Sequence, residues 1–437
     1  MVAAVLAALC LSSTLLLSSP VSAQATPPAG KPSAESARSP GTEIHFPEKL
    51  GPARIEMGAG YLDLTLALQL LATVLSAATG VDRHTSFDVG PRRMRFYPRG
   101  SFLNRRLQFG VQLNATPGSL EILDWWIGVR LLEQLQVRSG QFKIPFTRYR
   151  YQSFSRCLLV DWGNLTRTFG AERQIGIMLH NSGSGPRWDY SLGLFNGQNS
   201  RRSHGLGPAD VYAVPIANPS DLRNPGLLED RWHPELVGRL MYNSGDLEVF
   251  VPSDRQRGEF RYLLALSASW DNLADDQDLM TRNDVLRLAP EVMLKAYGAS
   301  LLAITYLGVE KTAMDEKSTL AMVGWLGELA YRFDRTWELA ARFSRVDYLK
   351  DLREDAGEYA AAQIAAASGT EAEQALSAQL AQAGAIKADQ EIAVGLNVYL
   401  VESELKLQTE VALLSAYLEG ARTRNDYRWR TQLQLAF

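Results

Sequence analysis

Strict alternation of apolar and polar residues is the sequence feature that most limits what this chain can fold into. It is clearest in residues 427–437, where one face carries Tyr427, Trp429, Thr431, Leu433, Leu435 and Phe437 and the other carries Arg428, Arg430, Gln432 and Gln434. A period of two residues belongs to a β-strand and would scatter these side chains around a helix. The same period returns at 61–78, 104–114 and 389–401. The chain is therefore predicted to be built from amphipathic strands.

Sixteen segments with strand character can be placed along the chain. They are 61–78, 89–98, 104–114, 121–132, 134–145, 171–181, 187–197, 233–243, 259–271, 286–296, 298–309, 319–333, 335–347, 389–401, 403–416 and 425–437. Short connections alternate with long ones at 146–170, 198–232, 272–284 and 349–388, and 243–258 is the one long connection on the short side. Outer-membrane barrels alternate short periplasmic turns with long external loops. We predict an all-β fold, a transmembrane antiparallel up-and-down β-barrel of about sixteen strands.

Composition agrees with a barrel and argues against a bundle of membrane helices. The hydrophobic fraction is 46% and the mean hydropathy is −0.14, whereas each membrane helix needs about 20 nearly continuous apolar residues. The alternatives are a membrane helix at 64–78 and a soluble β-sandwich. Asp63, Gln69 and the strict alternation oppose the helix, and the even number of hairpin-connected strands opposes the sandwich. A sixteen-stranded barrel is wide enough to enclose water and small solutes.

The N-terminus predicts export. Residues 1–23 have the form of a signal peptide, with an apolar run from Val2 to Leu17 and a small-residue cleavage site at Val21-Ser22-Ala23. A membrane anchor is the alternative, but the run is short for a span. Residues 24–55 are expected to be a flexible periplasmic segment and 56–437 the barrel, in the outer membrane of a Gram-negative bacterium. Removal of the leader leaves Cys157 as the one cysteine, which excludes an intramolecular disulfide.

Several segments carry a resemblance to a known family. They include Arg92-Arg93-Met94-Arg95-Phe96, Gly140-Gln141-Phe142-Lys143-Ile144-Pro145-Phe146, Tyr190-Ser191-Leu192-Gly193-Leu194-Phe195-Asn196-Gly197 and the ending Gln432-Leu433-Gln434-Leu435-Ala436-Phe437. With these the chain resembles the phosphate-selective porins, which are trimers of sixteen-stranded barrels. The resemblance implies a homotrimer and a loop at 146–170 that folds into the pore. The family's phosphate channels are rich in pore lysines, whereas this segment offers mainly Lys143. The long Ala/Gln-rich loop at 349–388 is peculiar to this chain, and the stretch 355–390 is expected to be helical.

Positive charge is concentrated where the resemblance places the constriction. Residues 88–173 hold 14 Lys and Arg against 6 Asp and Glu, although the whole chain has a net charge of −3. Strand parity puts Arg93, Arg95, Arg106, Arg130 and Lys143 on the lumen face, and Arg148, Arg150, Arg156 and Arg167 lie in the inward loop. A positive field in a narrow channel raises the local concentration of anions. The alternative is that these arginines contact lipopolysaccharide or pair with Asp161 and Glu172.

These observations predict a passive porin for small hydrophilic solutes, selective for anions such as phosphate. Its other expected partners are outer-membrane lipid and lipopolysaccharide, with no nucleic acid. An enzyme is not expected, because the five histidines lack metal-ligand spacing and no Gly-x-Ser-x-Gly elbow occurs; no cofactor or metal is predicted. The alternative function is a plugged or structural barrel whose long external loops bind a partner. A measurement of pore conductance distinguishes the porin from the plugged barrel.

Overall fold

The computed structural model describes the barrel and part of its loops. The described residues are 43–45, 51–79, 82–116, 118–169, 173–181, 187–197, 234–245, 247–271, 285–311, 318–354, 358, 386–420 and 423–437. The predicted signal peptide at 1–23 lies outside them, as do most of the predicted lead-in and of the Ala/Gln-rich loop. The barrel belongs to the compact unit from Thr42 to Phe437.

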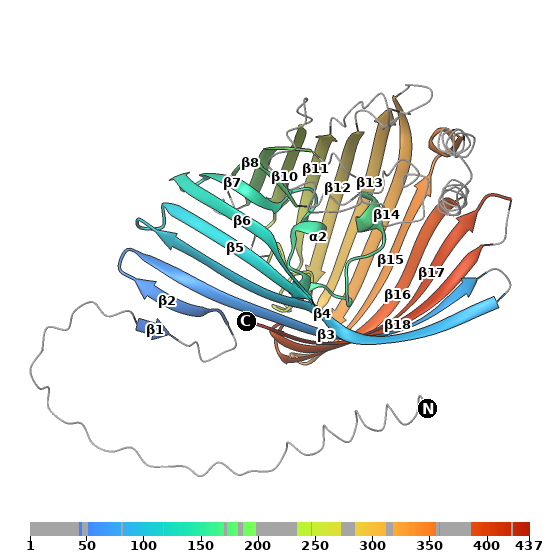
Figure 1. The fold of residues 1–437 in the computed structure, drawn as a ribbon, viewed down its shortest axis with the longest axis horizontal. Coiled ribbons are helices and arrows are strands. Elements are labelled where there is room, and N and C mark those ends of the chain that lie inside the picture. Colours follow the sequence, from blue (N-terminus) through green and yellow to red (C-terminus); the bar gives the residue numbers. More distant parts are fainter. Residues whose placement is uncertain are drawn as a thin grey trace, which may run out of the picture. The chain divides into compact units, whose positions relative to one another are not determined.

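Sixteen antiparallel strands form a closed ring (Figure 1). In chain order they are β3 (Gly60–Thr79), β4 (Asp82–Phe102), β5 (Leu107–Thr116), β6 (Ser119–Leu132), β7 (Leu135–Lys143), β8 (Arg173–His180), β9 (Trp188–Phe195), β10 (Glu235–Asn243), β11 (Arg261–Asp271), β12 (Val285–Ala296), β13 (Ala299–Lys311), β14 (Ser318–Arg332), β15 (Trp337–Tyr348), β16 (Ile386–Val401), β17 (Leu405–Leu418) and β18 (Arg424–Ala436). Each pairs with its neighbour in sequence. The predicted barrel of sixteen strands is confirmed.

The ring closes where the last strand meets the first. Strand β18 pairs with β3 from Tyr427 opposite Ser76 to Ala436 opposite Ala67. Beyond the ladder, the backbone N–H of Leu66 donates to the carbonyl of Phe437 at 2.7 Å. Hydrocarbon offers no hydrogen-bond partners, so a membrane-spanning sheet has to close in this way.

Two short strands precede the barrel, and both begin inside the range 24–55 that was predicted to be a flexible lead-in. Strand β2 (Ala53–Met57) pairs with the first residues of β3, and β1 (Glu43–His45) pairs with β2. Strand β3 is longer than β18 at this end, so its first residues have an open edge to which β2 adds.

The two faces of the wall differ as the alternation requires. On β11 the outward side chains Leu264, Leu266 and Trp270 are 47%, 54% and 40% exposed, whereas the inward Leu263 and Ser267 are buried. The segment predicted as an alternative membrane helix forms β3, so that alternative is wrong. Within the described ranges, no helix is both long and apolar enough to span a membrane.

Aromatic side chains gather at the end of the barrel that carries the short turns. Trp188 contacts Tyr242 at 5.0 Å between ring centroids, Tyr242 contacts Tyr262 at 6.1 Å, and Tyr262 contacts Phe260 at 6.1 Å. Such girdles lie at the membrane–water interface, where the rings meet both lipid and water. This end is therefore assigned to the periplasmic interface.

The lipid-facing assignment of β11 can be tested with a buried charge. We expect Leu266→Arg, near the middle of the strand, to lower the free energy of unfolding in lipid vesicles by about 2–4 kcal/mol, because arginine is costly at the bilayer midplane. The matched variant Phe260→Arg, at the interface, should cost roughly 0–1 kcal/mol. Equal losses in denaturant titrations of the two variants would contradict the assignment.

Candidate functional site

The connection between β7 and β8 folds into the lumen and runs along the inner wall. It contains the short helices α2 (Arg148–Tyr151), η1 (Phe154–Arg156) and α3 (Leu165–Phe169), and α2 lies inside the ring of strands (Figure 1). We call residues 144–169 the pore loop. The inward course expected for 146–170 is therefore seen over the described part of that connection.

The pore loop is held by side chains that point inward from the wall. Its backbone N–H groups bond to Ser267 of β11, Glu291 of β12, Glu391 of β16 and Glu410 of β17. Its carbonyls accept from Asn397, Lys406, Gln408 and Gln434. A buried backbone segment needs such partners, since each unsatisfied group would cost free energy. The wall from β11 to β18 thus fixes the course of the pore loop.

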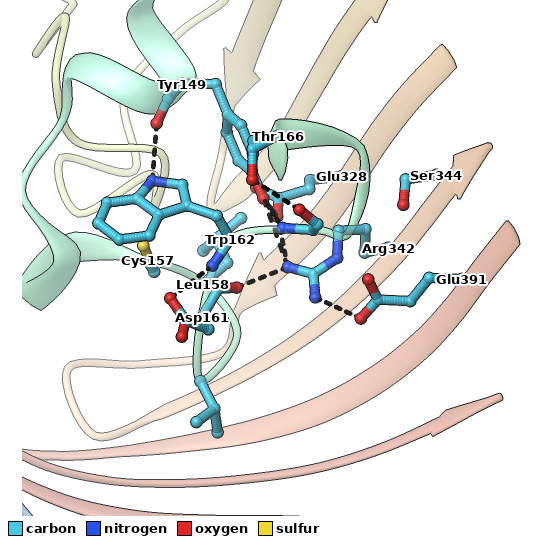
Figure 2. A network of polar contacts seen from close by, with 12 residues as sticks. Tyr149, Cys157, Leu158, Asp161, Trp162, Thr166, Glu328, Arg342, Ser344 and Glu391 are labelled. Atoms are coloured by element: carbon cyan, nitrogen blue, oxygen red, sulfur yellow. Dashed lines mark hydrogen bonds and ion pairs between the residues drawn. The ribbon is translucent and has the colours of Figure 1, made fainter. Parts of the chain in front are cut away.

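Arg342 of β15 is the centre of one of these anchors (Figure 2). Its guanidinium lies 3.3 Å from Glu328 and 2.7 Å from Glu391, and it donates to the backbone carbonyl of Asp161 at 2.8 Å. The two carboxylates also bind the loop, because Glu328 accepts from the hydroxyl of Tyr149 and Glu391 from the N–H of Asn164. All three charged side chains are almost fully buried. We call Arg342, Glu328 and Glu391 the anchor triad.

Tyr149 and Trp162 join the two ends of the pore loop to each other. The hydroxyl of Tyr149 accepts from the N–H of Gly163 at 3.0 Å, and the indole N–H of Trp162 donates to the carbonyl of Tyr149 at 2.9 Å. Tyr149 also packs in an apolar cluster with Phe146, Phe169 and Tyr306. On this side the loop and the wall form a packed core.

Cationic side chains face the other side of the loop, around two aromatic rings. Arg93 and Arg95 of β4 lie 5.1 and 4.6 Å from the ring of Phe154. Arg150 and Lys143 lie 4.5 and 4.9 Å from the ring of Trp162. A positive charge over a ring face is attracted by the ring quadrupole. The aromatic rings of the loop therefore hold the positive groups of the wall and of α2 in one place.

Two further arginines and two carboxylates complete this group. Arg92 donates to Asp161 at 2.6 Å and Arg93 donates to the same carboxylate at 2.9 Å. Arg173 lies opposite Lys143 in the ladder and donates to Asp124 at 2.6 Å. The constriction cluster is thus defined as Arg92, Arg93, Arg95, Lys143, Arg150 and Arg173 with Asp124 and Asp161. Six cations and two carboxylates leave an excess of four positive charges.

A β-bulge turns Arg92 inward. The register of β3 against β4 shifts so that Gln69 faces Arg93 and Leu70 faces Pro91, which leaves Arg92 as the extra residue. A bulge re-aims a side chain that strand parity would send to the other face. Proline lacks an N–H for the ladder and inside a sheet is confined to edges and bulges. Pro91 is therefore the sequence feature that indicates a bulge at this point of β4.

The other predicted site residues lie elsewhere. Arg148 is 0% exposed and donates a hydrogen bond to the carbonyl of Val249 at 3.0 Å. Arg106 is exposed in the turn after β4, because that strand runs through the turn predicted at Gly100-Ser101 and ends at Phe102. Arg130, near the end of β6, hydrogen-bonds through its backbone to Arg106. Arg156 is exposed on η1, and the side chain of Arg167 lies outside the described residues.

A second segment enters the lumen from the periplasmic side and meets the pore loop. It is the long connection after β10, in which the carbonyl of Val249 accepts from Arg148 and Phe250 contacts Tyr151 at 5.6 Å between ring centroids. Lys295 of β12 holds it through the carbonyl of Ser253 at 3.0 Å. This inward packing explains why the connection between β10 and β11 is longer than the tight turns described at the same end of the barrel.

The described residues show no metal or thiol chemistry. Among them, no group of three or more His, Cys, Asp and Glu side chains could hold a metal ion. Cys157 of the pore loop is buried, and burial raises the pKa of its thiol to about 11. A thiol in this state is a packed residue and not a nucleophile.

Comparisons with known proteins agree with the geometry. The family model of the phosphate-selective porins O and P matches residues 66–220. Solved structures with a similar fold include the outer membrane channel DcaP of Acinetobacter baumannii (12% identity, 87% of this chain and 99% of that chain, TM-score 0.53). The anion-selective porin from Comamonas acidovorans is similar as well (11% identity, 86% and 100%, TM-score 0.52). No curated protein matches the sequence. The resemblance to the phosphate-selective porins is confirmed over residues 66–220, and the barrel has the fold of outer-membrane channels.

Proposed function

We propose that this outer-membrane porin lets small hydrophilic solutes diffuse passively and prefers anions, phosphate or other small oxyanions among them. The observation that carries the proposal is the constriction cluster, in which wall arginines and the pore loop bring six cations together. Several carboxylates of the lumen wall from β11 to β18 are bonded to the pore loop or to buried arginines, such as Glu410 with Arg430 at 2.7 Å. The constriction cluster, by contrast, has more cations than carboxylates.

The chemistry of these side chains favours oxyanions. A guanidinium keeps its charge at every physiological pH and matches the two oxygens of a carboxylate or phosphate. In a narrow channel with low-dielectric walls, a positive field raises the local concentration of anions and lowers that of cations. Passage also requires that binding be weak enough for release, and the pairing of Asp124 with Arg173 lowers the net positive charge of the cluster.

Conductance of the purified protein in a planar bilayer tests the proposal directly. We expect discrete single-channel steps, a reversal potential of anion-selective sign under a KCl gradient, and block on addition of phosphate. Cation selectivity would overturn the role proposed for the arginines, but the protein would still be a porin. An absence of conductance would favour the plugged barrel, which the packed apolar core between pore loop and wall would then explain.

A single charge in the cluster should have a measurable effect on selectivity. We expect Arg95→Gln to lower the anion-to-cation permeability ratio roughly three-fold, as for an interaction of about 0.6 kcal/mol in a water-filled channel. The matched control is Arg106→Gln, which removes the same charge from the exposed periplasmic turn. Equal reversal potentials for these two variants would show that the field does not originate in the cluster.

A further inference from the structure

Asp161 has a position in the constriction that the proposed function does not account for. Its two carboxylate oxygens are divided between two guanidinium groups, Oδ1 with Arg93 at 2.9 Å and Oδ2 with Arg92 at 2.6 Å. The two arginines are consecutive in sequence, and the bulge at Arg92 is what allows both to reach one carboxylate. An oxyanion in transit would be expected to bind between these same two groups.

The carboxylate lies at the border between buried and open space. Its side chain is 13% exposed, that of Arg93 is 8% exposed, and that of Arg92 is 43% exposed. Burial raises the pKa of Asp161, but Arg93 and Arg92 outweigh this and hold it below its usual range. The carboxylate is therefore ionised at any pH at which the porin functions, and it faces the cations permanently.

The backbone that carries Asp161 does not depend on this carboxylate. The carbonyl of Asp161 accepts from Arg342 at 2.8 Å, and the N–H of Val160 donates to Glu410 at 3.0 Å. The carboxylate itself accepts from the N–H of Trp162, a bond that the side-chain oxygen of an asparagine could keep. The charge can thus be removed while the pore loop keeps its main anchors.

We infer that Asp161 is a specificity-determining residue, an internal carboxylate that occupies the oxyanion position between Arg92 and Arg93. The inference rests on the proposed function. Conduction requires binding that is favourable enough for entry and weak enough for exit. By neutralising Arg92 and Arg93, Asp161 weakens anion binding in the constriction enough for the anion to leave. Without it the pair becomes a retentive site for carboxylate or phosphate.

The test compares wild type with Asp161→Asn in planar bilayers. We expect the anion-to-cation permeability ratio to rise about three-fold or more. We expect the phosphate concentration for half-block to fall about ten-fold, as a second charge-assisted pair becomes available to the anion. Acetate, tested in the same way, shows whether a carboxylate shares the site. Asp161→Glu keeps the charge and should stay close to wild type in both quantities.

Controls separate the inference from the proposed function and from misfolding. Asp347→Asn removes a carboxylate from a residue pair with Arg345 outside the constriction cluster and should change neither quantity. A cation-selective wild type defeats the proposed function, whereas an anion-selective wild type that Asp161→Asn leaves unchanged defeats the inference alone. If Asp161→Asn does not assemble, the same comparison is made between Arg92→Gln and the double variant Arg92→Gln/Asp161→Asn, where unchanged values again overturn it.

Discussion

Replacing Arg342 by methionine is expected to release the pore loop from the wall and to enlarge the pore. The change leaves Glu328 and Glu391 buried without the guanidinium that joins them. Removing one partner of a buried ion pair costs about 3–5 kcal/mol, because the remaining charge is uncompensated. We expect that loss in the free energy of unfolding, measured in detergent, and a higher and noisier single-channel conductance.

Methionine is the informative substitution because it keeps much of the volume of the side chain. The expected loss then comes from charge and hydrogen bonding and not from a cavity. Arg342 also binds the carbonyl of Asp161 and lies 3.4 Å from the hydroxyl of Tyr149, so the loop loses direct contacts as well. Asn164 keeps its bond to Glu391. For this reason we expect the pore loop to shift within the lumen and not to leave it.

Arg345 supplies the matched control on the same strand. It lies three residues further along β15, where its side chain is 29% exposed and paired with Asp347 at 2.7 Å. Partly exposed pairs of this kind contribute about 0–1 kcal/mol. Arg345→Met should therefore leave both stability and conductance near wild type. If the single-channel conductance of Arg342→Met equals that of wild type, the anchor triad does not determine the width of the pore.

The strands could be predicted because a pleated wall between lipid and water imposes its period on the sequence. All sixteen predicted segments coincide with strands of the barrel, from β3 to β18. Boundaries were less predictable, since β4 runs to Phe102 and its turn uses positive φ angles at Leu103, Asn104 and Arg105. A turn of three residues in the left-handed region carries no glycine signal here. For that reason the sequence predicts Arg106 on the lumen face of a strand, whereas it lies in the exposed turn after β4.

The candidate site was predictable only in part. Strand parity correctly predicts that Arg93 and Arg95 face the lumen. The inward orientation of Arg92 can be predicted only if the bulge beside Pro91 is recognised. The partners of the pore loop had no local signal at all. Arg342 and Glu391 are far from Asp161 in sequence. Strand periodicity predicts that they face the lumen, but it does not distinguish them from any other lumen-facing residue. Which inward charges meet the loop is decided by the closed ring, a property of the whole chain.

Gly140→Ala is expected to prevent correct pairing of β6 with β7, at the point where the chain enters the pore loop. Gly140 has φ +129°, a conformation that L side chains rarely adopt. A Cβ there would lie 2.2 Å from the carbonyl oxygen of Trp125 and 2.7 Å from Cα of Trp126. Both contacts are with backbone, which cannot move without breaking the ladder. Backbone strain and overpacking together cost about 2–6 kcal/mol.

The folded fraction after refolding in detergent, read from heat-modifiable gel mobility, measures this effect. Gly128→Ala on the adjacent strand β6 is the control, because its added Cβ would meet the Trp126 side chain at 3.4 Å and its φ is ordinary. We expect a large loss of folded barrel for Gly140→Ala and little for Gly128→Ala. Equal folding of the two would show that β7 tolerates a shift at this position. Since Lys143 and the start of the pore loop follow within a few residues, such a shift would displace the constriction cluster, so any barrel that does fold should have altered anion selectivity.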